Sequence, residues 1–333
     1  MKICIITCHN SDNHGARLQA YALVKHLRDL GNEVEIIDYR PPYMNPTYRV
    51  FYWPGSSFRG WGRFFYYLVH RIRMKRRHRV FVSFSNQFLP LTERVYHGID
   101  DLRRYPPVAD LYLAGSDQIW NTTFPNGTDP AFYLDFGPDT VRRESYAASF
   151  ATEEILPSAI PFVKENLKRF DKITVRENSG LQILKKLGFH GEQKDDPVFL
   201  LSKNEWGALC DDTGQGKRYV LVYDFFSDSR IKKKAKEVAR EKKLQIFAVC
   251  PHYQWYADKN YVTAGPCTFL ALIKNAACLI TNSFHGIAFS MIFGTPFVFV
   301  ERPDGLNARM NDLMESRSCA ALTRDQLDHS PSA

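Results

Sequence analysis

Residues 1–40 alternate strand, helix and strand patterns, and this order constrains the fold more than any other feature. An apolar run at 2–7 precedes a polar loop and a helix pattern over 15–30, whose apolar residues recur at spacings of four and three. Gly31 ends this helix, and EVEIID at 33–38 forms a second strand. Parallel strands joined by a helix predict a doubly wound α/β domain with ligands at the carboxyl ends of its strands.

The same rhythm restarts after a polar, glycine-containing segment at 211–217, which we interpret as a linker. The chain has 333 residues, enough for two domains of ordinary size. We predict an N-terminal α/β domain over 1–210 and a C-terminal one over 211–333, two Rossmann-like doubly wound domains facing each other across a cleft. Further strands are predicted at 111–114, 145–149, 173–175, 219–224, 245–250, 277–281 and 297–300, and helices at 158–170, 179–187, 229–243, 268–275 and 284–293.

Composition restricts where such a chain can work. The formal net charge of +8 favours anionic partners without identifying them. No apolar run approaches the roughly 20 residues of a membrane-spanning helix, and we expect no signal peptide because the N-terminus lacks a small-residue cleavage site after an apolar core. Cys4, Cys250 and Cys278 lie in strand-like apolar runs, as reduced thiols of a cytoplasmic protein do.

The segment 280–294, ITNSFHGIAFSMIFG, has the strongest functional signal. Ser283 is a favourable N-cap, so the free amides of the helix's first turn should lie near His285. Such a helix start attracts anions, and an imidazole beside a bound anion suits acid–base catalysis on a phosphorylated or carboxylated substrate. The alternative is a histidine that only caps its helix or hydrogen-bonds a neighbouring strand, and the local pattern leaves both interpretations open.

Two polar loops follow predicted strands in the first half of the chain. The loop that contains Asn13 and Gly15 lacks the glycine spacing of a dinucleotide fingerprint or a P-loop, so it is either a ligand loop or a plain turn. The second loop combines hydrogen-bonding side chains with Trp120, which suits a sugar site or a structural turn anchored by the tryptophan. Its other candidate positions are Gly115, Ser116, Asp117 and Gln118.

Arg176 directly follows a strand and should project from its carboxyl end, where it could hold a carboxylate or phosphate. The alternative is a salt bridge, for example to Glu177 or Asp195. We also reject a metal site near the N-terminus, because the spacing of its cysteines and histidines matches no familiar zinc arrangement. Those residues are Cys4, Cys8, His9 and His14. Nothing in the sequence indicates a flavin or nicotinamide, so we expect no cofactor.

The segment 58–79 breaks the α/β rhythm with an aromatic-rich first half and a strongly basic second half. Such a stretch suits weak contact with a membrane surface or with anionic headgroups. The alternative is a helix that packs its aromatic residues on the domain and leaves its basic face in water. No recognised nucleic-acid module accompanies the basic patch, so we expect no nucleic-acid partner. A lipid contact would place this cytoplasmic protein at the inner membrane.

Several of these segments occur in the order that one known family shows, and they span residues 1 to about 300. They are NHGA at 13–16 with LQAY at 18–21, IDYRP at 37–41, GSDQIWN at 115–121, SYAAS at 145–149, VRE at 175–177, DPV at 196–198 and TNSFHG at 281–286. With this ordered set the chain resembles the polysaccharide pyruvyl transferase family.

The resemblance implies a fold similar to the GT-B glycosyltransferases and transfer of a pyruvyl group from phosphoenolpyruvate to two sugar hydroxyls as a cyclic ketal. The acceptor would be a glycan or lipid-linked oligosaccharide of cell-surface or capsular polysaccharide synthesis. It implies that the C-terminal domain mainly holds the donor, with His285 as the catalytic residue and no metal. Donor-binding residues would be Arg176, Asn282, Ser283 and Gly286, and acceptor or cleft residues Asn13, Gly15, Gly115, Ser116, Asp117 and Gln118.

This sequence departs from the family pattern at one position. Better-known pyruvyltransferases of the family carry an arginine two residues before the histidine, where this chain has Ser283. Either another arginine supplies the positive charge, or the donor differs. The candidates are Arg17, Arg302 and Arg309. The rival functions are a GT-B-like glycosyltransferase that uses a nucleotide sugar and a non-catalytic glycan-binding relative.

Overall fold

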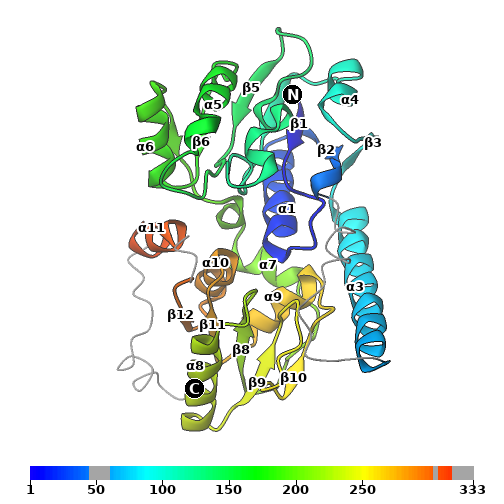
Figure 1. Cartoon of the computed structure of the whole chain (residues 1–333), viewed down its shortest axis with the longest axis vertical. Coiled ribbons are helices and arrows are strands. Elements are labelled where there is room, and N and C mark those ends of the chain that lie inside the picture. Colours follow the sequence, from blue (N-terminus) through cyan, green and yellow to red (C-terminus); the bar gives the residue numbers. More distant parts are fainter. Residues whose placement is uncertain (45–60, 303–306, 317–333) are drawn as a thin grey trace. The chain divides into compact units, whose positions relative to one another are not determined.

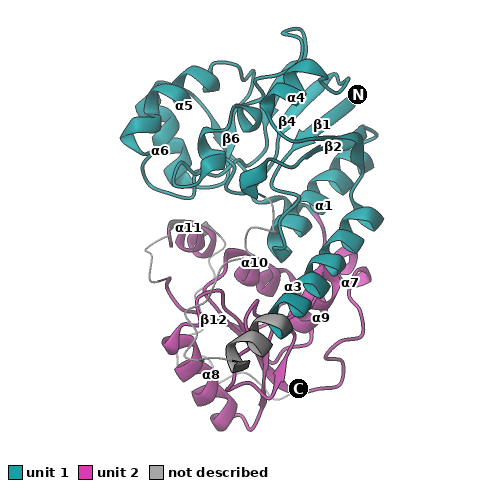
Figure 2. Ribbon diagram, turned by 45° about the vertical axis from the view of Figure 1, so that its right-hand side comes forward, with its two compact units in different colours: residues 1–200 teal, residues 201–333 magenta. Residues whose placement is uncertain are grey.

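The computed structural model describes residues 1–44, 61–302 and 307–316, which fall into two units, Met1–Leu200 and Leu201–Ala333 (Figures 1 and 2). The N-terminal unit contains a five-stranded parallel sheet in the order β3-β2-β1-β4-β5. Its strands are β1 (Lys2–Ile6), β2 (Glu33–Tyr39), β3 (Leu91–Tyr96), β4 (Leu111–Ala114) and β5 (Arg142–Ser145). The α-helices of this unit are α1 (His14–Asp29), α3 (Trp61–Phe88), α4 (Ile99–Arg104), α5 (Ile160–Leu167) and α6 (Asn178–Leu187).

The C-terminal unit repeats this topology, with a parallel sheet in the order β10-β9-β8-β11-β12. Its strands are β8 (Tyr219–Tyr223), β9 (Gln245–Ala248), β10 (Lys259–Asn260), β11 (Cys278–Thr281) and β12 (Phe297–Phe299). Its α-helices are α7 (Lys203–Ala208), α8 (Ser229–Glu241), α9 (Pro266–Lys274), α10 (Phe284–Phe293) and α11 (Ala308–Ser316). Both units thus have the strand order of a Rossmann-like half, and the predicted fold class of two such units is confirmed.

Local patterns predicted some elements well and others poorly. The predicted bounds of β4 and α10 are confirmed. The strand predicted at 145–149 is wrong, since β5 ends at Ser145 and Ala147 has a φ of 48°. A left-handed backbone at a residue other than glycine ends the extended geometry. Beyond it, Ala148 makes only isolated bridges, to Asp117 and Val175, in place of a continued strand.

The division between the units lies before α7, whereas the polar segment 211–217 belongs to the C-terminal unit. Trp206 of α7 is fully buried, and its ring lies 5.0 Å from that of Phe289 in α10 at nearly a right angle. Edge-to-face packing of two large aromatic rings attaches α7 to the second core. Sequence polarity indicated the later boundary because α7 is a short, mostly polar helix whose one buried residue gives no sign of which core it joins.

The small sheet of the N-terminal unit pairs β6 (Thr174–Val175) with β7 (Glu192–Gln193), and it places Arg176 directly after β6. The segment predicted at 58–79 contributes to α3, which runs from Trp61 to Phe88, while residues 58–60 lie outside the described part of the chain. Among the described residues, no helix combines the length and the apolar character needed to cross a bilayer.

Replacing Trp206 by alanine should destabilise the C-terminal unit by about 3–5 kcal/mol, because a buried ring is lost and a cavity remains. Trp255 is 86% exposed, so Trp255→Ala provides a matched control that should stay within about 0.5 kcal/mol of the parent. Urea unfolding of the full chain measures both. Equal effects of the two substitutions would contradict the assignment of α7 to this core.

Candidate functional site

Each unit has one place where the strand order reverses, and most of the predicted site residues lie in the loops that follow strands at these two places. In the N-terminal unit the reversal lies between β1 and β4, which are followed by the loops of Asn13 and of Ser116. In the C-terminal unit it lies between β8 and β11, and β11 leads to His285. Open α/β sheets bind ligands at this reversal, on the carboxyl side of the strands.

Asp224 joins the ends of β8 and β11 in the C-terminal unit. Its carboxylate accepts the amides of Phe226 at 2.8 Å and Asp228 at 2.6 Å, and it accepts Asn282 Nδ2 at 3.1 Å. Asp224 and Asn282 are both buried. The Asn282 side-chain oxygen has no hydrogen-bond partner in the part of the chain that the structure describes. A buried acceptor of this kind is suited to a hydroxyl or amine of a ligand.

The predicted N-cap at Ser283 is confirmed. Its hydroxyl accepts the Gly286 amide at 3.4 Å, while its own amide donates to Thr281 Oγ1 at 3.0 Å. A Cβ at Gly286 would lie 3.0 Å from Thr281 Oγ1 and 3.3 Å from Tyr223 Cδ1. A side chain at this position would have to push these neighbours away slightly, because the first turn of α10 packs directly on the ends of β8 and β11.

His285 is the second residue of α10 and is 8% exposed. Its ring lies 5.2 Å from the ring of Phe284, perpendicular to it. The guanidinium of Arg309, a buried residue of α11, lies over the same Phe284 ring at 5.6 Å. One aromatic side chain thus contacts both an imidazole and a cation beside a helix N-terminus, a combination that favours anions.

The other two arginines considered from sequence have other contacts within their own units. Arg302 stacks over Phe226 at 4.9 Å, in the turn that follows Asp224. Arg17 belongs to α1 in the N-terminal unit, where it donates to the Ser11 carbonyl at 3.0 Å, and burial lowers its pKa to about 10. Arg309 and His285 both contact the Phe284 ring.

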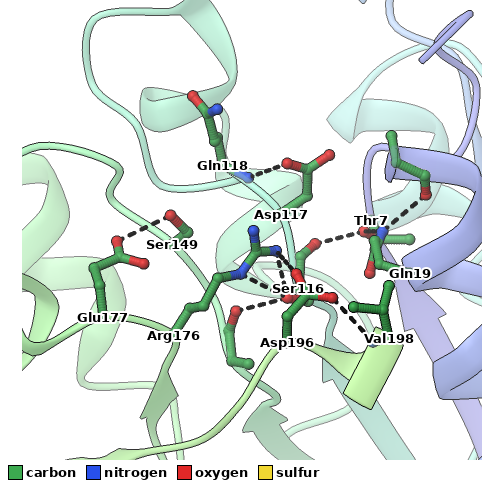
Figure 3. Close-up of polar contacts among 12 residues, drawn as sticks. Thr7, Gln19, Ser116, Asp117, Gln118, Ser149, Arg176, Glu177, Asp196 and Val198 are labelled. Carbon is green, nitrogen blue, oxygen red and sulfur yellow. Dashed lines mark hydrogen bonds and ion pairs between the residues drawn. The ribbon is translucent and has the colours of Figure 1, made fainter. Parts of the chain in front are cut away.

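In the N-terminal unit the loops after β1 and β4 are hydrogen-bonded to each other. Thr7 Oγ1 donates to the Ser116 carbonyl at 2.7 Å and accepts Gln19 Nε2 at 3.0 Å (Figure 3). Asn13 caps α1 by accepting the Ala16 amide at 3.3 Å. A Cβ at Gly115 would come within 3.1 Å of both Ile5 and Thr7. Both loops are therefore held by the end of β1, and Gly15 lies buried in the first turn of α1.

Arg176 forms a buried ion pair with Asp196 at 2.9 Å (Figure 3). Its guanidinium also donates to Ser116 Oγ, from Nε at 3.2 Å and from Nη2 at 2.5 Å. The alternative interpretation, a salt bridge, is confirmed, but its carboxylate is Asp196 and neither of the two examples, Glu177 and Asp195. Asp195 is exposed, and Glu177 instead accepts the Ser149 hydroxyl and the Ala151 amide, each at 2.9 Å.

This network brings together segments that are far apart in the sequence. Ser116 belongs to the loop after β4, Arg176 follows β6, and Asp196 precedes a 3-10 helix whose Val198 amide it accepts at 3.0 Å. The Arg176 side chain is only 2% exposed, so in this structure it positions the Ser116 loop from within. Its predicted contact with a donor stays a prediction.

The outer part of the same loop is partly exposed at Asp117 and Gln118. Asp117 has a φ of 86°, a strained conformation for a residue other than glycine, and its carboxylate accepts the Gln118 amide at 2.8 Å. Trp120, in contrast, is fully buried, donates to the Phe132 carbonyl at 3.1 Å and stacks on Tyr133. The hypothesis that Trp120 covers a sugar ring is therefore wrong, because its faces are already occupied by the core.

Sequence reasoning missed a charged cluster at the ends of β1 and β2. Asp38 accepts Nε and Nη2 of Arg40 at 2.6 and 2.7 Å and lies 3.2 Å from Nε2 of His9. Burial lowers the pKa of His9, with Asp38 opposing that shift. Burial raises the pKa of Asp38, but the His9 and Arg40 contacts outweigh it, so the pKa is lowered overall. The position of these residues could have indicated the cluster. His9 follows β1 and Asp38 lies at the end of β2, and the two strands are parallel neighbours.

Among the described residues, no group of three or more histidine, cysteine, aspartate or glutamate side chains is arranged to hold a metal ion. The rejected set included Cys8, whose pKa is raised by burial, and thiolate is the form that binds metals. His9, from the same set, is taken up by Asp38 and the Thr7 carbonyl, each at 3.2 Å.

Comparisons with known proteins add a family and several distant structural likenesses. The model of the family "Polysaccharide pyruvyl transferase" matches residues 13–304, which include the strands at both reversals or the loops that follow them. No curated protein sequence matches the chain. Spinosyn rhamnosyltransferase SpnG is 11% identical over 99% of this chain and 88% of its own, with a TM-score of 0.44. A UDP-N-acetylglucosamine 2-epimerase from Rickettsia bellii is 10% identical over 92% and 82%, with a TM-score of 0.48.

Removing the cation of the buried pair should be costly. Arg176→Ala leaves the Asp196 carboxylate buried without its guanidinium, which we expect to destabilise the fold by about 3–5 kcal/mol. Lys168→Ala breaks the exposed pair with Glu165 and should cost less than about 1 kcal/mol. The double variant Arg176→Met/Asp196→Asn should be less destabilised than Arg176→Met alone, because asparagine carries no charge that is left buried without a partner. Urea unfolding measures the series, and equal losses in Arg176→Ala and Lys168→Ala would contradict a structural role for Arg176.

Proposed function

We propose a function from the premise that the chain belongs to the polysaccharide pyruvyl transferase family. It transfers a pyruvyl group from phosphoenolpyruvate to two hydroxyls of a sugar, forming a ketal during cell-surface polysaccharide synthesis. The observation that carries this proposal is the placement of His285 in the capped first turn of α10, with Arg309 on the adjoining Phe284 ring. This arrangement supports an anionic donor next to a proton donor.

The chemistry defines what these side chains must do. Protonation of the methylene carbon of phosphoenolpyruvate makes the central carbon electrophilic, and a sugar hydroxyl attacks it and loses its proton. The bond to the phosphate oxygen breaks, inorganic phosphate leaves with the bonding pair, and a second hydroxyl closes the ketal. His285 supplies the proton to the methylene carbon as general acid. A fixed cation and helix-start amides stabilise the charge that moves onto the leaving phosphate.

Arg309 takes the electrostatic role of the arginine that is absent at position 283. Ser283 is occupied with capping α10, and a hydroxyl carries no charge to balance a phosphate or carboxylate. Arg309 comes from a different helix but contacts the residue that lies between Ser283 and His285. The donor contacts of the proposal are therefore Arg309, Asn282 and the first turn of α10 up to Gly286, with Arg176 positioning the N-terminal loop.

The N-terminal unit provides the acceptor side of the proposal. Asp117 and Gln118 are the partly exposed polar side chains of the loop after β4, and the Asn13 loop adjoins it through Thr7 and Ser116. Carboxylate and amide groups of this kind hydrogen-bond sugar hydroxyls. The acceptor is a glycan, and the proposal extends to a lipid-linked oligosaccharide met in the cytoplasm at the inner membrane. The scheme uses no cofactor.

Replacing His285 tests the general acid directly. His285→Ala and His285→Gln should lower phosphate release from phosphoenolpyruvate in the presence of a glycan acceptor panel by roughly 10²–10⁴-fold. His190 is exposed on the N-terminal unit, so His190→Ala is a matched control that should retain the parent rate. An undiminished rate in His285→Ala, or no phosphate release by the parent with any acceptor, would count against the proposal.

Thermal shift measurements with different ligands separate the rival functions. A glycosyltransferase that uses a nucleotide sugar should show thermal stabilisation by nucleoside diphosphates and none by phosphoenolpyruvate. A non-catalytic glycan-binding relative should be stabilised by glycan alone.

Arg309→Gln should raise the KM for phosphoenolpyruvate by roughly 10–100-fold, the size expected for losing hydrogen bonds between charged groups. The value of kcat should change less, because the substitution removes binding to the donor and leaves His285 in place. Arg240 is exposed on α8, and Arg240→Gln removes the same charge as a control. A KM equal in Arg309→Gln and Arg240→Gln would show that the cation of the donor site lies elsewhere.

A further inference from the structure

The outer face of α3 combines basic and aliphatic side chains in one helical row. Val69, Ile72 and Val80 are 44%, 45% and 40% exposed. Three arginines at the intervening turns are exposed as well: Arg73, Arg76 and Arg79. Spacings of three and four residues place all six on one side of the helix, over roughly 17 Å of its length. We call these six residues the α3 stripe.

A comparison with α8 shows what is unusual about the α3 stripe. α8 is also basic, with exposed Lys233, Lys236 and Arg240, but its aliphatic residues Ile231 and Val238 are buried in the core. That arrangement is an ordinary solvated face. On α3 the aliphatic side chains lie among the arginines on the exposed side, where water contact with apolar surface is unfavourable.

The charge of α3 has one sign. From Trp61 to Phe88 the sequence WGRFFYYLVHRIRMKRRHRVFVSFSNQF contains no aspartate or glutamate. A lone basic face would suit any polyanion, but exposed valine and isoleucine beside it gain nothing from a soluble polyanion. Anionic lipid satisfies both features, since its headgroups pair with arginine while the aliphatic side chains enter the boundary with the acyl chains.

The opposite face of α3 is fixed to the loop that contains Asn13. Arg77 is buried, donates to the Asp12 carbonyl at 3.1 Å and lies over the Phe81 ring. His78 Nδ1 lies 3.0 Å from Asp12 Oδ1, and the Phe81 ring lies 5.0 Å from that of His14. One helix therefore presents the α3 stripe on one side and contacts the proposed acceptor loop on the other.

We propose that the α3 stripe docks the protein on an anionic lipid surface and thereby holds the Asn13 loop near the headgroups. A sugar carried on a lipid would be presented at that depth. The contact with lipid stands on the α3 stripe alone, whereas its use for a lipid-linked acceptor rests on the proposed function.

Cosedimentation with vesicles tests the docking surface without donor or acceptor. The full chain should bind vesicles of phosphatidylcholine with phosphatidylglycerol, bind pure phosphatidylcholine weakly, and be released by salt. The variant Arg73→Gln/Arg76→Gln/Arg79→Gln should lose affinity by on the order of a hundredfold. The variant Val69→Ser/Ile72→Ser/Val80→Ser should lose several-fold with its charge intact. The control Lys233→Gln/Lys236→Gln/Arg240→Gln removes the same charge from α8 and should bind like the parent.

Three outcomes would overturn the lipid surface: no binding by the parent, equal loss in the α8 control, or an aliphatic variant that binds like the parent. The last would indicate a general polyanion site. Circular dichroism and melting temperature show whether each variant is folded. Phosphate release with a soluble acceptor reports the proposed function separately, since α3 stripe variants should keep that rate and lose rate only with an acceptor embedded in anionic vesicles.

Discussion

The buried ion pair between Arg176 and Asp196 is the interaction on which the loop after β4 depends. Moving two charges out of water is expensive, and the cost is offset only when the remaining donors and acceptors are also satisfied. Ser116 and the Val198 amide contribute to this by hydrogen-bonding the two charged groups. The pair therefore fixes the loop after β4 in one place, because any displacement of Ser116 would leave a buried charge poorly solvated.

In the C-terminal unit, hydrogen bonds to Asp224 hold the loops that follow β8 and β11. Asp224 is buried as well, but its partners are two backbone amides and the Asn282 side chain. Helix α10, capped by Ser283, then packs closely on β8 and β11, so that a Cβ at Gly286 would lie 3.0 Å from Thr281 Oγ1. Both units thus have the same sheet topology, and in both units buried polar interactions fix the loops at the strand reversal. A rigid scaffold with loops fixed in this way is what precise placement of a substrate requires.

The sequence predicted features that are set locally and failed where partners come from distant segments. The apolar run of α10 and its serine cap identified that helix with its correct bounds. The burial of Trp120 could not be foreseen, because a tryptophan in a polar loop looks the same whether it faces a sugar or the core. The partner of Arg176 was misassigned because Asp195 and Asp196 are adjacent in sequence, and only the turn at Pro197 decides which carboxylate faces inward.

At position 283 this chain lacks the charge that the family motif places there. The family pattern has an arginine at the position of Ser283. If the motif alone formed the donor site, the serine would indicate that the site is lost. Helix α11 instead brings Arg309 to the ring that also contacts His285, from outside the segment that carries the resemblance. An anion responds to the position of a charge and not to the element that carries it. In the proposed site Ser283 need not supply charge, and its hydroxyl accepts the Gly286 amide in the first turn of α10, the turn that contains His285.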